Sequence, residues 1–292
     1  MVEPFVAPAL PPPVANALEA SVDGERITVE AAGIPWSALR WGDPADRPLL
    51  LIHGVTSSAA VWWRVGPALA AAGYHVTAVD QAGHGLTGHW RGHHRLRDNA
   101  VDIASFIRAA GLDRGDLRVV GHSWGAATAA ALPIAGIRPA TLVLLDTPVV
   151  PYLAIAATAT QSDERAYDSI DEARDGVRRA NPDWSAGDVD AKAEALTQLD
   201  AEAARAVLLD NGDWDGGLAD LREPVAADLD VWLVRGDPAS GGYVPDVAAR
   251  AFAAVIGDDH VITLAGAPHS PQRTHPVATT AALLRALGVV TA

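Results

Sequence analysis

The chain has 292 residues, 49% of them hydrophobic, which suffices for one large α/β domain or for a core domain that carries an insertion. Its 22 basic and 36 acidic residues give a formal net charge of −14, which disfavours nucleic acid and anionic membranes as partners. Because cysteine is absent, disulfides, thiolate nucleophiles and cysteine-based metal sites are excluded, and we expect a cytoplasmic location.

The first 24 residues are expected to form an N-terminal arm with little order. Glu3 stands where a secretion signal would carry a basic residue, and prolines recur between residues 4 and 13. No run along the sequence reaches the roughly 18 apolar residues that a membrane span requires. We therefore expect a soluble protein that has no membrane partner.

From residue 25 onward, short β-rich runs alternate with longer helical runs. The expected elements up to residue 146 are, in chain order, a hairpin of Arg26–Val29 and Trp36–Trp41, strand Leu49–Ile52, helix Ala59–Ala72, strand Tyr74–Val79, helix Asn99–Ala110, strand Leu117–Val120, helix Gly125–Leu132 and strand Thr141–Leu145. This alternation predicts an α/β fold, with a mostly parallel central sheet and helices on both of its faces.

The alternation stops between residues 147 and 222. Alanine-rich helical runs such as Asp163–Ala180 and Asp188–Leu209 replace the buried strands there, which predicts a helical insertion. The sheet pattern returns in residues 223–292, where we expect strand Val231–Val234, helix Asp246–Val255, strand His260–Leu264 and helix Pro276–Leu287. Residues 25–146 and 223–292 are therefore assigned to one core.

The most informative segment is Gly121–Gly125, with the sequence Gly-His-Ser-Trp-Gly. It follows an apolar strand and precedes an alanine-rich helical run. Glycines on both sides of a serine permit the sharp strand-to-helix turn that presents a nucleophile near the start of a helix. Ser123 is therefore the expected nucleophile of an acyl-transfer reaction.

A serine hydroxyl needs a neighbouring base, and the base needs an acceptor that fixes its tautomer. His269 follows the last expected strand, at the sheet edge where the loops of open α/β folds carry functional residues. In folds of this layout the carboxylate comes between nucleophile and base in the chain. Asp237 follows one strand in that interval and Asp146 follows an earlier one; we expect Asp237 to be the acid and keep Asp146 as the alternative.

Five short segments, in a fixed order, match one known family. They are Leu51–Val55, Asp80–Gly85, Gly121–Gly125, Arg235–Pro238 and Gly266–Ser270. On these segments the chain resembles the α/β-hydrolase superfamily over about residues 25–290. The resemblance implies that Ser123 is the nucleophile, His269 the base and Asp237 the orienting acid. It also implies an oxyanion hole formed by the backbone N–H groups of Val55 and Trp124, and a helical lid at residues 147–222.

Departures from the family pattern narrow the resemblance. Ser123 replaces the aspartate nucleophile of the haloalkane dehalogenases and epoxide hydrolases of this fold, and Val55-Thr56 lacks the proline common in both. A single glycine after His53 differs from the glycine-rich oxyanion loop of the hormone-sensitive-lipase-like esterases. The chain is thus most similar to the lidded esterases, lactonases and carbon–carbon hydrolases.

Histidines and tryptophans near these segments admit two interpretations. Trp124 and His53 are kept as candidate substrate contacts, although packing explains the tryptophan equally well and structural hydrogen bonding is the commoner role of such a histidine. The histidines at positions 84, 89, 93 and 94 are irregularly spaced, which favours a solvated loop over a zinc site. No metal is therefore expected.

Together these features predict a cofactor-independent serine hydrolase that cleaves a small-molecule ester or lactone through an acyl-enzyme on Ser123. A carbon–carbon hydrolase of ring-fission diketones could use the same residues, and a non-catalytic small-molecule-binding protein is the third interpretation. Turnover of a diketone but of no ester would identify the second. Tight ligand binding with negligible turnover would identify the third.

Overall fold

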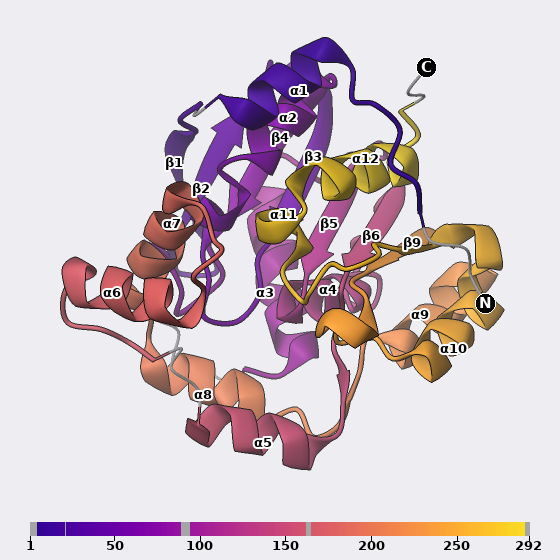
Figure 1. Ribbon diagram of the computed structural model, residues 1–292. Coiled ribbons are helices and arrows are strands. Elements are labelled where there is room, and N and C mark those ends of the chain that lie inside the picture. The colour runs from indigo at the N-terminus through magenta and orange to yellow at the C-terminus, as the bar shows by residue number, and fades with distance from the viewer. Residues whose placement is uncertain (1–4, 21, 89–93, 162–164, 290–292) are drawn as a thin grey trace.

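An eight-stranded sheet forms the centre of the computed structural model, which describes residues 5–20, 22–88, 94–161 and 165–289 (Figure 1). The strand order is β1-β2-β4-β3-β5-β6-β9-β10. Its strands are β1 (Glu25–Ala31), β2 (Ile34–Trp41), β3 (Arg47–Ile52), β4 (Tyr74–Val79), β5 (Arg118–His122), β6 (Thr141–Leu145), β9 (Asp230–Arg235) and β10 (Val261–Thr263). Only β2 among them runs against the others, so the expected mostly parallel sheet is confirmed.

Burial explains why the central strands read as continuous apolar runs. Residues 48–52 of β3 and all of β6 are buried, as expected for a parallel sheet that is covered on both faces. At one edge, β1 and β2 form the expected antiparallel hairpin, which turns between Ala31 and Ile34.

Helices cover both faces of this sheet, as the alternation predicted. One face carries α1 (Pro12–Glu19), α2 (Val65–Ala71) and α12 (Pro276–Ala286). The other face carries α3 (Leu96–Ala109), α4 (Trp124–Ala130), α9 (Leu218–Ala226) and α10 (Asp246–Ile256). The two buried clusters that result contain most of the apolar side chains of the sheet, which therefore acts as a rigid platform for the loops at its carboxyl edge.

Between β6 and β9 the chain leaves the sheet and forms mainly helices. Before α9 these helices are α5 (Tyr152–Gln161), α6 (Ile170–Ala180), α7 (Ala186–Thr197) and α8 (Ala201–Leu209). The short strands β7 (Val149–Val150) and β8 (Trp214–Asp215) pair antiparallel, so both ends of this segment lie side by side. We call residues 151–213 the insertion; Figure 1 shows its helices beside and below the sheet.

The expected boundary of the insertion at residue 222 stays a prediction. Helix α9 begins at Leu218, inside the expected range, but Leu221 belongs to the buried cluster of the core. The long helical run expected over Asp188–Leu209 is divided into α7 and α8. Asp200 begins the second helix, since its carboxylate accepts hydrogen bonds from the backbone of the first turn.

The expectation of little order in the N-terminal arm is wrong for residues 12–19, which form α1. Prolines at the first positions of a helix lose no hydrogen bond, because the first N–H groups have no acceptor within the helix. Val14 and Leu18 lie one turn apart and are both buried against the core. Burial of this apolar pair therefore fixes a segment whose proline content suggested none.

The single helix expected over residues 59–72 is also divided, into the 3-10 turn η1 (Ala59–Trp62) and α2. Pro67 lies in the first turn of α2 and has no N–H with which to bond the carbonyl of Trp63. The break therefore falls directly before that turn.

Candidate active site

Ser123 lies in a strained turn between β5 and α4. Its backbone has φ +55° and ψ −127°, a conformation that side-chain-bearing residues rarely adopt. The flanking glycines leave the room that this turn needs. A Cβ atom at Gly121 would collide with the carbonyl of Gly125, and one at Gly125 would collide with the carbonyl of His53. The turn expected from the sequence is therefore present.

Two further side chains complete a hydrogen-bonded chain with Ser123. The Nε2 atom of His269 lies 2.8 Å from the Ser123 Oγ atom, and its Nδ1 atom lies 2.7 Å from Asp146 Oδ2. Because the Asp146 carboxylate only accepts, the Nδ1–H group of His269 donates to it and Nε2 is left to accept the serine proton. The Asp146 side chain is fully buried and accepts two more bonds, from the N–H groups of Gly236 and Tyr243.

The expectation that Asp237 contacts His269 is wrong. One Asp237 oxygen accepts the N–H of Ala239 at 2.9 Å and the other accepts the N–H of Gly266 at 3.0 Å. These backbone hydrogen bonds, that of Gly266 first, lower the pKa of Asp237 below its ordinary value. Asp237 instead begins the 3-10 turn η2 (Pro238–Ser240) at the partly exposed rim. The carboxylate that contacts His269 is that of Asp146, the alternative kept from the sequence.

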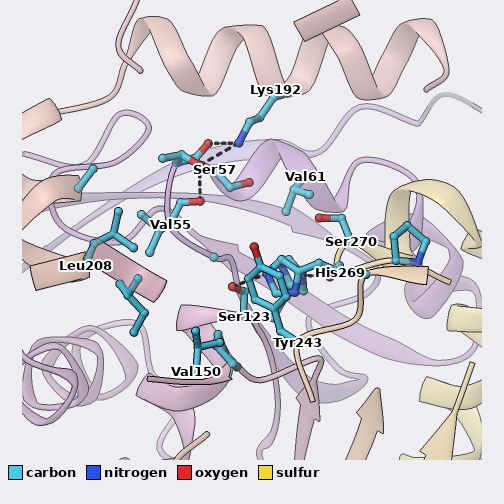
Figure 2. A pocket seen from close by; sticks show the side chains of 18 of the residues that line it. Val55, Ser57, Val61, Ser123, Val150, Lys192, Leu208, Tyr243, His269 and Ser270 are labelled. Atoms are coloured by element: carbon cyan, nitrogen blue, oxygen red, sulfur yellow. Dashed lines mark hydrogen bonds between the residues drawn. The ribbon is translucent and has the colours of Figure 1, made fainter. Parts of the chain in front are cut away.

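Ser123 and His269 open into a cavity of about 1000 Å³ (Figure 2). Its walls come from loops at the carboxyl edge of the sheet and from the insertion. Apolar lining residues include Val61, Val150, Ile155, Leu208 and Trp214, and polar ones include Ser57, Lys192, Gln272 and Arg273. A cavity of this size accommodates a small organic molecule.

The backbone after β3 passes directly against Ser123. A Cβ atom at Gly54 would lie 2.9 Å from the Cβ atom of Ser123, so only glycine permits this approach. Val55 follows and lines the cavity. Trp124 is the first residue of α4, where N–H groups have no acceptor within the helix. The oxyanion hole expected from the Val55 and Trp124 backbones stays a prediction that this arrangement allows.

The side chains of His53 and Trp124 lie behind the cavity. His53 donates from Nδ1 to the carbonyl of Gly54 and accepts at Nε2 from the N–H of Gln81, and burial lowers its pKa to about 4. The Trp124 ring is fully buried and packs with Ile155, Val207 and Trp214. Neither side chain is among the described residues that line the cavity, so the expected substrate contacts are wrong.

Two aromatic rings flank His269. The Nε2–H group of His122 donates to the His269 carbonyl at 2.8 Å, and burial holds the pKa of His122 well below its ordinary value. The ring of Tyr243 stacks on that of His269, with centroids 3.9 Å apart and planes 17° apart. Sequence reasoning missed Tyr243, since a tyrosine in a loop between β9 and α10 carries no motif.

Hydrogen bonds join the insertion to the core beside the cavity. The Lys192 ammonium on α7 donates to the carbonyl and the hydroxyl of Thr56, each at 2.9 Å. Arg273, on α11 (Pro271–Thr274), donates to the carbonyl of Asp188 on α7 at 2.9 Å. Sequence reasoning missed both cations, because a lysine in an alanine-rich helix gives no signal of where its side chain points.

The described residues contain no group of three histidine and carboxylate side chains arranged to hold a metal ion. His89 and His93 of the histidine-rich segment lie outside them. Within the same described ranges, no helix is both long and apolar enough to cross a membrane.

The family follows from a match over most of the chain. The model of the alpha/beta hydrolase family matches residues 49–283. This chain belongs to the alpha/beta hydrolase family. Solved structures agree on the fold of this alpha/beta hydrolase. The crystal structure of E-2-(acetamidomethylene)succinate hydrolase has a TM-score of 0.74 at 24% identity, covering 91% of this chain and 99% of the other. The esterase RhEst1 from Rhodococcus sp. ECU1013 has a TM-score of 0.69 at 19% identity, covering 92% and 100%.

Similar sequences come from Mycobacterium tuberculosis (strain ATCC 25618 / H37Rv). Lipase LipV is 28% identical over 266 residues, which cover 85% of this chain and 96% of LipV. Epoxide hydrolase B is 36% identical over 83 residues, or 28% of this chain and 23% of that protein. Epoxide hydrolase A is 31% identical over 140 residues, or 46% and 42%. The chain thus matches less than half the length of either epoxide hydrolase but nearly all of the lipase.

Proposed function

We propose that this protein is a serine hydrolase that cleaves a carboxylic ester or a lactone through an acyl-enzyme on Ser123. The observation that carries the proposal is the hydrogen-bonded chain from Ser123 through His269 to Asp146. It lies at the wall of a cavity large enough for a small organic substrate (Figure 2).

In the first step, Ser123 Oγ attacks the carbonyl carbon while its proton moves to Nε2 of His269. The imidazolium that forms is stabilised by the buried Asp146 carboxylate, which also keeps the ring oriented. The carbonyl oxygen, on which negative charge develops, accepts hydrogen bonds from the backbone N–H groups of Val55 and Trp124. Loss of one such donor typically lowers turnover by about 10²- to 10³-fold.

In the second step, the C–O bond breaks and His269 returns the proton to the departing alcohol oxygen. Water then attacks the acyl-enzyme carbonyl while His269 again accepts a proton. The bond between the acyl carbon and Ser123 Oγ breaks, His269 passes the proton to Oγ, and the acid is released. A lactone follows the same course, except that the alcohol remains attached to the acid that is released.

Ester chemistry is favoured over epoxide chemistry by two observations. An oxygen nucleophile with an adjacent base suits a carbonyl carbon, and Ser123 stands where the resemblance gives the epoxide hydrolases an aspartate. The relative matched over nearly its whole length is named a lipase, whereas the two epoxide hydrolases match over less than half of theirs.

The test is hydrolysis of p-nitrophenyl esters of increasing acyl length, and of several lactones, by the wild type and by Ser123→Ala. We expect kcat on every accepted substrate to fall by about 10⁴-fold or more in the variant. A fluorophosphonate probe should label the wild type at Ser123 and leave the variant unlabelled. Unchanged turnover in a folded Ser123→Ala protein would refute the proposal.

A further inference from the structure

One part of the cavity is lined by apolar side chains that come from both the core and the insertion. We call it the apolar wall, and it consists of Val55 after β3, Val150 of β7, Ile155 of α5, Leu208 of α8 and Trp214 of β8. Ile155 and Trp214 form a buried cluster with Trp124 and Val207, and the other three side chains pack against it. Because Trp124 directly follows Ser123, the wall extends from the insertion to the nucleophile.

The apolar wall has surface that a ligand can cover. Val55, Val150 and Leu208 are half-buried and line the cavity, whereas the Trp124 ring in the same cluster is fully buried. Each CH₂ group of a ligand that moves from water onto such a surface strengthens binding by up to about fourfold. The wall can therefore distinguish short apolar groups from longer ones.

The position of His269 determines which part of an ester meets this wall. In the proposed reaction His269 returns its proton to the departing alcohol oxygen, so that oxygen must lie within hydrogen-bond reach of Nε2. The acyl chain, attached to the same carbonyl carbon, then extends away from the histidine. In Figure 2, His269 lies to the right of Ser123. Val55 and Leu208 lie to the left, so the apolar wall is on the acyl side.

The alcohol side of the site is more open. Gly241 and Tyr243 line the cavity there and are exposed, and the Tyr243 ring stacks on His269. An alcohol group at this position stays partly in water, so lengthening it buries little additional surface. The two parts of an ester thus meet surroundings that differ in how much of the ligand they cover.

We propose that this hydrolase selects its esters by an apolar acyl group, which lies against the apolar wall, and that it tolerates changes in the alcohol. This inference rests on the proposed ester hydrolysis. Leu208 is the specificity-determining residue, because its side chain packs on the buried cluster and keeps surface toward the cavity.

The first experiment varies the two parts of the ester separately. p-Nitrophenyl acetate, butanoate and heptanoate differ in the acyl chain, and methyl, propyl and pentyl butanoate differ in the alcohol. Each kcat/KM is divided by the rate constant for hydroxide hydrolysis of the same ester, which removes differences in intrinsic reactivity. We expect this ratio to rise by about 30-fold or more from acetate to heptanoate, and by less than about fivefold from methyl to pentyl.

The second experiment changes polarity at constant length. In p-nitrophenyl 5-methoxypentanoate an ether oxygen replaces one CH₂ group of the heptanoate, and neither ester carries a charge on its acyl chain. Burial of the ether oxygen against an apolar surface is unfavourable, since no donor there replaces its bonds to water. We expect a kcat/KM about tenfold lower than for the heptanoate.

Variants then assign the preference to Leu208. Leu208→Gln keeps the approximate size of the side chain and should lower kcat/KM for the heptanoate by about tenfold, while the acetate changes less than about threefold. It should also narrow the difference between the heptanoate and its ether analogue. Leu208→Met keeps the surface apolar and should retain the wild-type profile. Leu209→Gln makes the same change at the next residue of α8, which does not line the cavity, and should retain that profile as well.

The outcomes separate this inference from the proposed function. Serine-dependent turnover that is insensitive to acyl length, or that depends more on the alcohol, would overturn acyl selection and leave the hydrolase standing. So would equal effects of Leu208→Gln and Leu209→Gln. Absence of serine-dependent turnover would overturn the hydrolase instead. Fluorescence titration with the neutral apolar probe 1-N-phenylnaphthylamine would then decide on the wall, which requires saturable binding that Leu208→Gln weakens at least fivefold and Leu209→Gln does not.

Discussion

Asp146 and Asp237 follow neighbouring parallel strands, yet only Asp146 meets His269. In the pairing of β6 with β9, Leu145 lies opposite Val234, so Asp146 is level with Arg235. Asp237 comes two residues later, about 7 Å further along an extended chain. It therefore passes the edge of the sheet and reaches the rim, whereas Asp146 remains in the buried layer beneath the histidine.

A position after a strand end identifies the candidates for the triad acid, but the register between β6 and β9 decides which of them reaches His269. Asp146 has φ +42°, a left-handed conformation that aspartate tolerates better than most residues. It offers a buried carboxylate with backbone donors on two sides. In Asp237, one carboxylate oxygen accepts a hydrogen bond from its own turn and the other accepts one from Gly266, and neither oxygen faces His269.

The largest effect should come from Asp146→Asn. The amide cannot stabilise the imidazolium of His269 and favours the wrong tautomer, so kcat/KM on a p-nitrophenyl ester should fall by about 10³- to 10⁴-fold. Thermal unfolding should show that the variant is folded. A comparable loss of kcat/KM in Asp237→Asn would contradict the assignment of Asp146 as the acid that supports His269.

A smaller loss of activity is expected from a change at Tyr243, in the loop that leads from Asp237 back to the active site. Tyr243 stacks on His269 and donates its backbone N–H to Asp146. Tyr243→Ala removes the ring that restrains the imidazole, so kcat should fall by about tenfold on short and long esters alike. Tyr243→Phe keeps the stacking and should retain wild-type kcat, and a tenfold loss there would assign the effect to the phenol group.

The smallest effect should come from Asp237→Asn, with kcat/KM within about threefold of wild type. Because backbone bonds lower the folded-state pKa of Asp237 below its ordinary 3.8, the carboxylate stabilises the fold above that pH. This contribution is lost as the pH falls through the lowered pKa. The Tm difference between the two proteins should thus be small at pH 6 and shrink as the pH falls below the ordinary 3.8 of an aspartate; a difference that grows in acid would contradict it.

The sequence sufficed for features that depend on local pattern. The alternation of apolar strands and helices predicted the sheet, and the glycines around Ser123 predicted the turn that holds it. The position of His269 after the last strand was enough to place it against the serine. Each of these follows from short segments whose geometry the rest of the chain hardly alters.

Features that depend on how distant segments meet could not be predicted. The choice of Asp146 depends on strand register, and no local pattern encodes it. The burial of the Trp124 ring and the approach of Lys192 to Thr56 depend on how the insertion packs on the core. The helix at residues 12–19 likewise exists because Val14 and Leu18 find an apolar surface, which proline content alone does not reveal.

The pairing of β7 with β8 brings the two ends of the insertion together. Val150 lies opposite Trp214, so the chain departs from the core and returns to it at one place. Lengthening or replacing what lies between them leaves the two anchor points unchanged, and the entropic penalty of a longer loop grows only with the logarithm of its length. We therefore expect that the length and sequence of the insertion can change without displacing Ser123, His269 and Asp146.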